Sequence, residues 1–377
     1  MGQYAEGSVW FYAPNNVAPI VFMILFLFSG CLHTWQTIKY KSWRTTGLLP
    51  WAAVLMITGF LTRELGAYDY EKLEYVIAST VLILSGPPVY ALINYFILSR
   101  ILYYMPYLSP MHPGRVVTTF AGLDVIVEIM LAQGAWRSVH SGISESERQA
   151  GEDLVRASLL LQVVLFLVFM CLVAYVHFKA ARASLLSGRI RTVIYVLYVS
   201  SAIVTIRCIY RIVEYFQGWE GTLFQNEPYF WVFEASIMFI NTVLLNVWFP
   251  GKRLPRSNSC FLARDGVTQM RGPGWSDDRP WLINMFDPLD IYGLVTGRKH
   301  LAFWHMTQEE LDVLRAQKKA NKRPWYALVF DPLHLWGPRG YIGKRFSKGQ
   351  AYRGTSDREA PTSSIPRTLK EFERTDV

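Results

Sequence analysis

Several motifs and residue types are scarce in this chain, and each absence excludes a class of protein. The sequence contains no Gly-x-x-x-x-Gly-Lys-Ser/Thr motif, so it lacks the phosphate-binding loop of an ATP-hydrolysing transporter. It has only four cysteines. Cys31, Cys171 and Cys208 lie in long apolar segments and Cys260 follows them, which does not indicate a disulfide framework. No Asn-x-Ser/Thr glycosylation sequence occurs.

Lysine and histidine are nearly absent from the apolar segments. None of these segments contains a lysine, so the Schiff-base lysine that a retinal protein requires is missing. Only His33 and His177 lie within them, near segment ends, whereas an intramembrane zinc hydrolase would need clustered histidines. We therefore expect no catalytic residue, no metal and no cofactor.

What the sequence does contain is seven long apolar segments. Each is close to or longer than the ~20 residues that a helix needs to cross a bilayer. A closed barrel would instead show alternating strands. The sequence therefore predicts an all-α polytopic membrane protein with a seven-helix bundle. The predicted spans are 17–38, 47–66, 75–99, 116–136, 154–178, 192–216 and 229–249.

Basic residues in the connecting loops predict the orientation of the bundle. The loops after the first, third and fifth spans and the start of the tail hold twelve Lys and Arg, against three in the segments of the opposite side. Because basic loops stay cytoplasmic, the amino terminus is predicted outside and the carboxyl terminus in the cytoplasm. Residues 1–16 lack a basic n-region, so the first span is expected to act as its own insertion signal.

The chain divides into four predicted regions. Residues 1–16 form an extracellular terminus, 17–250 the bundle, 251–344 a basic cytoplasmic tail and 345–377 a disordered end. Residues 251–377 hold 22 Lys and Arg against 14 Asp and Glu. A basic segment beside a membrane indicates contact with anionic inner-leaflet lipids, and we expect no nucleic-acid partner.

The tail carries an internal repeat. Residues 279–293 and 323–337 agree at eight of fifteen positions. Two interpretations remain open. The copies are either similar Asx-Pro turns, or a docking module or membrane-surface lid, which would give the tail a cytoplasmic partner. Between the copies, 307–322 is predicted to be a helix capped by Thr307, with Glu310 at the capping-box position.

Charged side chains lie inside the predicted spans. Offsets of four and seven place Arg207, Arg211 and Glu214 on one helical face, and Asp124 and Glu128 are one turn apart. An ion on the lipid face costs ~3 kcal/mol or more, so these groups should face the bundle interior. Two alternatives remain open for Asp124 and Glu128: either Arg207 or Arg211 compensates them, or one of the two acids stays protonated.

Two interpretations of these charges are compatible with each other. They form a structural ion-pair network, or an outward-opening pocket for a headgroup, with Glu234 nearest the outer mouth. The candidate substrate-binding residues are Arg63, Glu64, Asp124, Glu128, Arg207, Tyr210, Arg211, Glu214 and Glu234.

The third span is interrupted by Gly86, Pro87 and Pro88. Proline removes a backbone hydrogen bond, so this tripeptide predicts a kink in the helix. The kink is either a gating element, as in transporters with broken helices, or a static bend.

The segment from the sixth to the seventh span carries a family resemblance. Residues 206–215 read Ile-Arg-Cys-Ile-Tyr-Arg-Ile-Val-Glu-Tyr, and Gly218, Gly221, Asn226-Glu227 and Val232-Phe233-Glu234 follow. This series resembles the fungal lipid-translocating exporter family, the RTA-like proteins. Residues 86–91 are similar to that family's third helix and residues 120–134 to its fourth. The resemblance covers residues 17–252.

The chain also departs from the family pattern. Phe249-Pro250 stands where the family usually has His-Pro, residues 63–68 match only approximately, and the tail lies outside the resemblance.

The resemblance implies a role in translocating or exporting amphiphilic lipids, either sphingoid-base-like or sterol-like, and in resistance to toxic amphiphiles. It implies a fungal membrane, first the plasma membrane and second an internal one such as the vacuole. The alternative is a heptahelical lipid sensor that signals through its cytoplasmic loops and tail.

Overall fold

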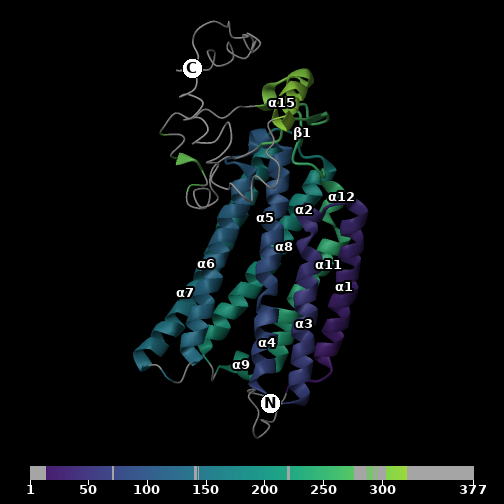
Figure 1. The fold of residues 1–377 in the computed structure, drawn as a ribbon. Helices are drawn as coiled ribbons and strands as arrows, with labels where there is room; N and C mark the ends of the chain where they lie inside the picture. Colours follow the sequence, from purple (N-terminus) through teal and green to yellow (C-terminus); the bar gives the residue numbers. More distant parts are fainter. Residues whose placement is uncertain are drawn as a thin grey trace, which may run out of the picture. The chain divides into compact units, whose positions relative to one another are not determined.

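The computed structural model describes a helical protein (Figure 1). The predicted repeat lies outside the described residues except for Asp287, Leu289, Asp290 and Ile291, and the segment 345–377 lies wholly outside them. The described residues are 14–69, 72–139, 142, 144–218, 221–275, 287, 289–291, 295 and 303–320.

The seven predicted spans are confirmed in number and position. Within the described residues, seven helical stretches are long and apolar enough to cross a membrane, and each contains most of one predicted span. They are Ala18–Tyr40, Leu48–Tyr68, Glu74–Tyr104, Pro113–Ser138, Glu145–Arg182, Gly188–Gln217 and Glu227–Arg253.

The first six stretches are built from seven helices, because the third stretch is divided in two. A short helix, α2, connects the first two stretches. The bounds are α1 Ala18–Tyr40, α2 Trp43–Thr46, α3 Leu48–Tyr68, α4 Leu73–Leu84, α5 Gly86–Tyr104, α6 Pro113–Val139, α7 Glu145–Arg182 and α8 Gly188–Gln217, with a 3-10 turn, η1, at Pro106–Leu108.

The seventh stretch is irregular. It follows a short helix, α9, and combines α-helical pieces with a π-helical segment, η2. Its parts are α9 Thr222–Gln225, α10 Glu227–Phe230, η2 Trp231–Ser236, α11 Ile237–Val247 and α12 Pro250–Arg253.

Helix α7 is longer than the sequence predicts, and a local cap explains why. It begins at Glu145 rather than near residue 154. Ser144 caps the amino end, since its Oγ accepts from the backbone N–H of Glu147 at 3.4 Å and the Glu147 carboxylate accepts from the backbone N–H of Ser144 at 3.1 Å. This reciprocal capping box satisfies two donors that would otherwise lack partners.

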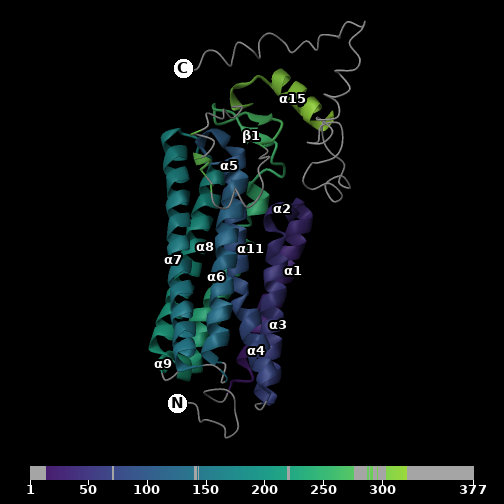
Figure 2. The same cartoon turned by 60° about the vertical axis from the view of Figure 1, so that its left-hand side comes forward.

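The helices form a ring in chain order. Each of α1, α3, α5, α6, α7 and α8 packs against the next, and α11 closes the ring by contacting both α8 and α1. A further contact joins α5 to α8 across the ring. In Figures 1 and 2, α6 and α7 lie on one side of the bundle and α1 and α3 on the other. The interior is filled by large buried side chains that include Tyr90, Tyr95, Phe26 and Phe166.

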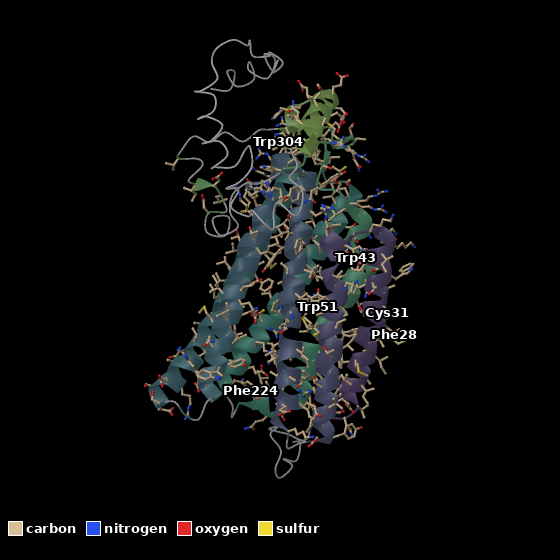
Figure 3. All side chains as sticks on the ribbon, viewed as in Figure 1. Phe28, Cys31, Trp43, Trp51, Phe224 and Trp304 are labelled. Atoms are coloured by element: carbon tan, nitrogen blue, oxygen red, sulfur yellow. The ribbon has the colours of Figure 1, made fainter. Side chains whose placement is uncertain are left out.

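The outer surface of the ring is apolar. On α1, Phe28 is 73% exposed and Cys31 is also exposed. Figure 3 shows both on the outer side of that helix, and Trp51 is half exposed on α3. An aqueous protein would not expose such a continuous apolar surface, so this is the face that contacts lipid. The chain is therefore an integral membrane protein.

Two glycines allow α6 and α7 to approach closely. A Cβ on Gly134 would lie 2.8 Å from the carbonyl oxygen of Gly151 and 2.9 Å from the backbone nitrogen of Val155. Backbone atoms cannot move aside without shifting a helix, so small residues are required here, as at other close contacts between membrane helices.

We expect Gly134→Ala to lower the stability of the protein by ~1–3 kcal/mol, the usual cost of overpacking. Gly188→Ala is the matched control, because a Cβ there would meet nothing within 4 Å. Thermal unfolding of both variants in detergent checks the difference. Equal midpoints for the two variants would show that α6 and α7 do not pack through Gly134.

Past α12 the described tail forms a small substructure. An antiparallel hairpin pairs β1, Cys260–Leu262, with β2, Gln269–Arg271. Phe261 packs with Phe303 of the 3-10 turn η3, Phe303–His305, and with Leu311 of α15, Gln308–Ala320.

The predicted helix in the tail is confirmed. The Thr307 backbone N–H donates to the Glu310 carboxylate at 2.9 Å, and the Glu310 N–H donates to Thr307 Oγ1 at 3.5 Å. These two bonds form the predicted capping box.

Candidate functional site

Four charged side chains meet inside the ring, near the carboxyl end of α8. Arg207, Arg211 and Glu214 share one face of α8, as their spacing predicts, and Glu234 reaches them from η2. We call these four residues the ion cluster. Tyr210 lies beside the cluster on α8.

Short hydrogen bonds join the members of the cluster. Arg207 Nε donates to both carboxylate oxygens of Glu234 at 2.9 Å, and its Nη2 donates to Oε1 at 2.7 Å. Arg211 Nε donates to Glu234 Oε2 at 2.8 Å, and its Nη1 donates to Glu214 Oε2 at 2.6 Å. The hydroxyl of Tyr210 donates to Glu214 Oε1 at 2.9 Å. Glu234 thus binds both guanidinium groups.

The cluster is buried and its formal charges balance. The side chain of Glu234 is 0% exposed and that of Arg207 is 3% exposed. Two guanidinium groups face two carboxylates, so the cluster is neutral as a whole. Removing ions from water is costly, and only good geometry with hydrogen bonds offsets that cost. The fork-shaped donation from Arg207 to Glu234 provides this geometry.

Glu234 reaches the cluster from a distorted helix. The segment Trp231–Ser236 is π-helical, a form that is rare and often found at functional sites. The wider turn changes the direction of the side chains that follow it relative to a regular α-helix. The sequence gives no signal for this distortion, although it does identify Glu234 as an intramembrane acid.

The predicted compensation of Asp124 by Arg207 or Arg211 is wrong. Both carboxylate oxygens of Asp124 are buried and have no hydrogen-bond partner among the described residues. No ion pair within that part of the chain joins Glu128 to either arginine, although Glu128 lies within electrostatic reach of Arg207. Helix α11, rather than α6, packs closely along α8, so the arginines find their carboxylate partner on the seventh span.

Arg63 forms a second buried ion pair, with a residue outside the ion cluster. Its Nη2 donates to Glu227 Oε1 at 2.9 Å, and the side chains are 5% and 11% exposed. The guanidinium carbon also lies 4.3 Å from the ring centroid of Phe230 and 5.2 Å from that of Trp231. This cation–π contact and the ion pair together connect α3 to the start of the seventh span.

Glu227 is a residue that sequence reasoning missed as a partner for Arg63. The sequence places Glu227 in a predicted outer loop, but the residue is buried at the start of α10. Its Oε2 accepts a hydrogen bond from the backbone N–H of Asn15 at 2.9 Å. Glu64, the neighbour of Arg63, is also buried, and its carboxylate has no hydrogen-bond partner among the described residues.

The third span is interrupted where the sequence predicts. Helix α4 ends at Leu84 and α5 begins at Gly86, with Ser85 between them. Pro87 and Pro88 occupy the first turn of α5, where proline is tolerated because its missing N–H has no helical partner. A Cβ on Gly86 would lie 2.7 Å from the sulfur of Met56 on α3, so the break also allows close packing. Whether it acts as a gate stays a prediction.

A small cleft lies between the end of α8 and helices α6, α7 and α9. It has a volume of about 60 Å³ and is lined by Ser138 of α6, Tyr215 at the end of α8, Phe224 of α9, and Glu152 and Arg156 of α7. Arg156 also pairs with Glu152 at 3.2 Å.

The tail hairpin contacts the loop between α5 and α6. Tyr107 in this loop donates to the carbonyl oxygen of Ala263 at 3.3 Å, and burial raises the pKa of Tyr107 to about 12, which keeps its hydroxyl protonated as a donor. Gln269 of β2 donates to the hydroxyl of Tyr104 at 3.0 Å. Arg115 pairs with Asp290 at 3.6 Å, and both side chains are buried. The first part of the tail is therefore attached to the bundle.

Comparison with known proteins decides the family. Residues 49–257 match the family described as "RTA1 like protein", and this segment includes the ion cluster. The chain belongs to the RTA1-like family. The resemblance read from the sequence is therefore confirmed, and the described tail after residue 257 lies outside the family match.

Fungal relatives of the RTA1-like family are similar along most of this chain. The "Lipid-translocating exporter-like protein RTA1" of Leptosphaeria maculans is 38% identical over 312 residues, which cover 77% of this chain and 60% of that protein. A protein of the same name from Ajellomyces capsulatus is 34% identical over 278 residues, or 69% and 86% of the two chains. "Protoporphyrin uptake protein 1" of Saccharomyces cerevisiae is 25% identical over 279 residues, or 63% and 91%.

The match thus spans less than two thirds of the Leptosphaeria maculans relative. No solved structure matches this member of the RTA1-like family.

Proposed function

We propose that this chain moves an amphiphilic lipid across a fungal membrane, and that the ion cluster forms the polar part of the route. The observation that carries the proposal is a set of four ionised side chains inside a ring whose outer surface is apolar. Two relatives of the chain are named lipid-translocating exporter-like proteins, which supports the same proposal. A lipid needs both surfaces, since its headgroup is polar and its tail is not.

A structural role alone does not account well for these ions. Replacing a buried ion pair by apolar side chains of similar volume is often neutral or stabilising. A ring whose only task is to hold together could therefore close without charges. Intramembrane ionisable residues more often mark a substrate or ion pathway, which favours transport.

The arrangement of the cluster suggests how a headgroup is bound. Glu214 has one guanidinium partner, Arg211, and one hydroxyl donor, Tyr210, whereas Glu234 binds two guanidinium groups. Glu214 is therefore the carboxylate that can accept an ammonium or hydroxyl headgroup with the smallest loss of existing ion pairs. We propose sphingoid-base-like or sterol-like amphiphiles as substrates, with export and resistance to toxic amphiphiles as the outcome.

The remaining candidate residues line the proposed route. Polar groups are added to the interior of the ring by α6, with Asp124 and Glu128, and by α3, with Arg63 and Glu64. The break at Gly86 is the proposed gate. We assign no bond-breaking or bond-forming step to the chain, and we propose that it has no cofactor.

We propose the plasma membrane as the location, with the vacuole as the second choice. The excess of basic residues in alternate loops supports an extracellular amino terminus and a cytoplasmic tail that contacts anionic lipids.

We expect an epitope tag after Val377 to be protected in intact cells and a tag before residue 10 to be accessible, because basic loops resist translocation. Antibody labelling before and after permeabilisation checks both tags. Labelling of the carboxyl-terminal tag in unpermeabilised cells would contradict the proposed orientation.

Efflux of a fluorescent sphingoid-base analogue from cells with and without this chain tests transport against sensing. We expect the chain to accelerate efflux within minutes, and to do so when new protein synthesis is blocked, because a carrier acts directly. An increase that begins late and requires protein synthesis would favour a sensor and contradict transport.

Substitution of Tyr210 tests the proposed role of the ion cluster. Tyr210→Phe removes one hydroxyl donor to Glu214 and leaves every ion pair in place, so we expect normal abundance at the membrane and an efflux rate reduced several-fold. Tyr198→Phe on the same helix is the control. Normal efflux in Tyr210→Phe, together with loss of efflux only in variants that fail to fold, would leave the cluster a purely structural element.

A further inference from the structure

The carboxyl group of Asp124 lies inside the ring and has no ion-pair partner among the described residues. The cluster's two guanidinium groups are matched by Glu214 and Glu234. Asp124, midway along α6, is 8% exposed, and neither of its oxygens has a hydrogen-bond partner among the described residues. The intramembrane acids therefore outnumber the cations available to them, and Asp124, like Glu64 and Glu128, is left without an ion-pair partner among the described residues.

A second orphaned group lies beside it. The side chain of Tyr95 on α5 is fully buried, and its hydroxyl lies within hydrogen-bonding reach of the Asp124 carboxyl and contacts no other hydrogen-bonding group within the described part of the chain. The ring of Tyr95 is fixed by contacts with Phe120 of α6 at 5.2 Å and Phe169 of α7 at 4.9 Å. A hydroxyl held in this way can donate to a carboxylate or accept from a protonated carboxyl.

Among the described residues, the other titratable groups around Asp124 supply no compensating cation. Glu128 follows one turn later on α6, and the buried thiol of Cys208 approaches from α8. That thiol lies 3.6 Å from the side-chain oxygen of Gln162 on α7. Helix α5 contributes Tyr95. The guanidinium of Arg207 lies within electrostatic reach of Glu128 but is bound by Glu234.

An isolated carboxylate in such surroundings is far more costly than a neutral carboxyl group, and a proton is the smallest cation that removes the charge. We infer that Asp124 is a proton-binding site, and that the movement of the amphiphile is coupled to the binding and release of a proton there. The coupling rests on the proposed transport function, whereas proton binding does not.

In the bound state the proton resides on a carboxylate oxygen of Asp124, and the Tyr95 hydroxyl accepts a hydrogen bond from it. In the released state the proton leaves to water that enters the ring, and the same hydroxyl rotates to donate to the carboxylate. No other atom gains or loses a proton, so the charge of the interior alternates between two values during each cycle.

Infrared spectroscopy of the full chain in neutral phospholipid vesicles tests proton binding directly. We expect a carbonyl band of a buried protonated carboxyl that disappears as the pH rises and is absent in Asp124→Asn. The band should remain in Asp153→Asn, which removes an exposed acid of α7, and in Glu128→Gln. Tyr95→Phe should keep the band and shift its titration midpoint. An unchanged band in Asp124→Asn, or no band in the wild type, would overturn the inference.

Amphiphile movement under an imposed pH gradient tests the coupling in the same vesicles. We expect the initial rate of the wild type to change with the direction of the gradient. In Asp124→Asn we expect equal rates under opposite gradients, whatever the rate of exchange at equal pH. A wild-type rate that responds to sodium but not to pH, or to neither, would overturn coupling by a proton, even if Asp124→Asn does not fold. A wild type that moves no amphiphile would refute the proposed function and leave the infrared result standing.

Discussion

Glu234→Ala is expected to remove most of the folded protein from the membrane. The substitution leaves two buried guanidinium groups without their shared carboxylate. Breaking one buried pair typically costs ~3–5 kcal/mol, and here Arg207 loses its only ion-pair partner among the described residues while Arg211 keeps Glu214. A loss of this size is comparable with the whole stability of many domains.

Membrane abundance and thermal unfolding in detergent measure this effect. Glu152→Ala is the matched control, because Glu152 also pairs with an arginine but its side chain is 33% exposed, and pairs of this kind are worth only ~0–1 kcal/mol. The stability and abundance of Glu234→Gln should lie between those of Glu234→Ala and Glu152→Ala, since the amide keeps the shape of the side chain and one acceptor oxygen. A stable and abundant Glu234→Ala protein would show that the ion cluster does not hold α8 to the seventh span.

Arg207→Ala is expected to have the second largest effect on stability. The free energy of unfolding should again fall by ~3–5 kcal/mol, the typical cost of breaking a buried ion pair. Arg207→Lys should recover only part of it, because an ammonium group cannot reproduce the fork in which Nε and Nη2 both contact Glu234. Arg156→Ala, which removes a partly exposed arginine of α7, is the control. The readout is the unfolding midpoint of the purified protein.

A double variant separates loss of the pair from general damage. In Arg207→Ala with Glu234→Ala, Arg211 and Glu214 can still pair at neutral charge. The double variant should therefore be less destabilised than the sum of the two single variants. Simple additivity would contradict a direct interaction between Arg207 and Glu234.

The spans and the shared face of α8 were predictable because they depend on local periodicity. A helix places residues four and seven apart on one face, so the alignment of Arg207, Arg211 and Glu214 follows from spacing alone. The break before Gly86 was predictable for the same reason, since proline acts on the backbone next to it.

The partners across helices were not predictable, because they depend on which helices meet. Charge balance alone suggests Asp124 as a partner for Arg207, and only the packing of α11 along α8 reveals Glu234 instead. The π-helical turn that carries Glu234 leaves no pattern in the sequence. Arg63 has an acidic neighbour in Glu64, yet it pairs with Glu227, which is 164 residues away.

The hairpin in the tail was also beyond sequence reasoning. Its strands are three residues each, too short for a clear alternation of apolar and polar side chains, and its contacts with Tyr104 and Tyr107 are tertiary. Only the capped helix that begins after Thr307 carries a local signal.

Transbilayer movement of a fluorescent amphiphile in vesicles that contain only the purified full chain tests the central claim most directly. The claim predicts that the chain accelerates the movement far above the rate in protein-free vesicles, and that Tyr210→Phe slows it while leaving the amount of reconstituted protein unchanged. A wild-type rate equal to that of protein-free vesicles, with correctly folded protein in the membrane, would contradict the claim that this chain moves lipids.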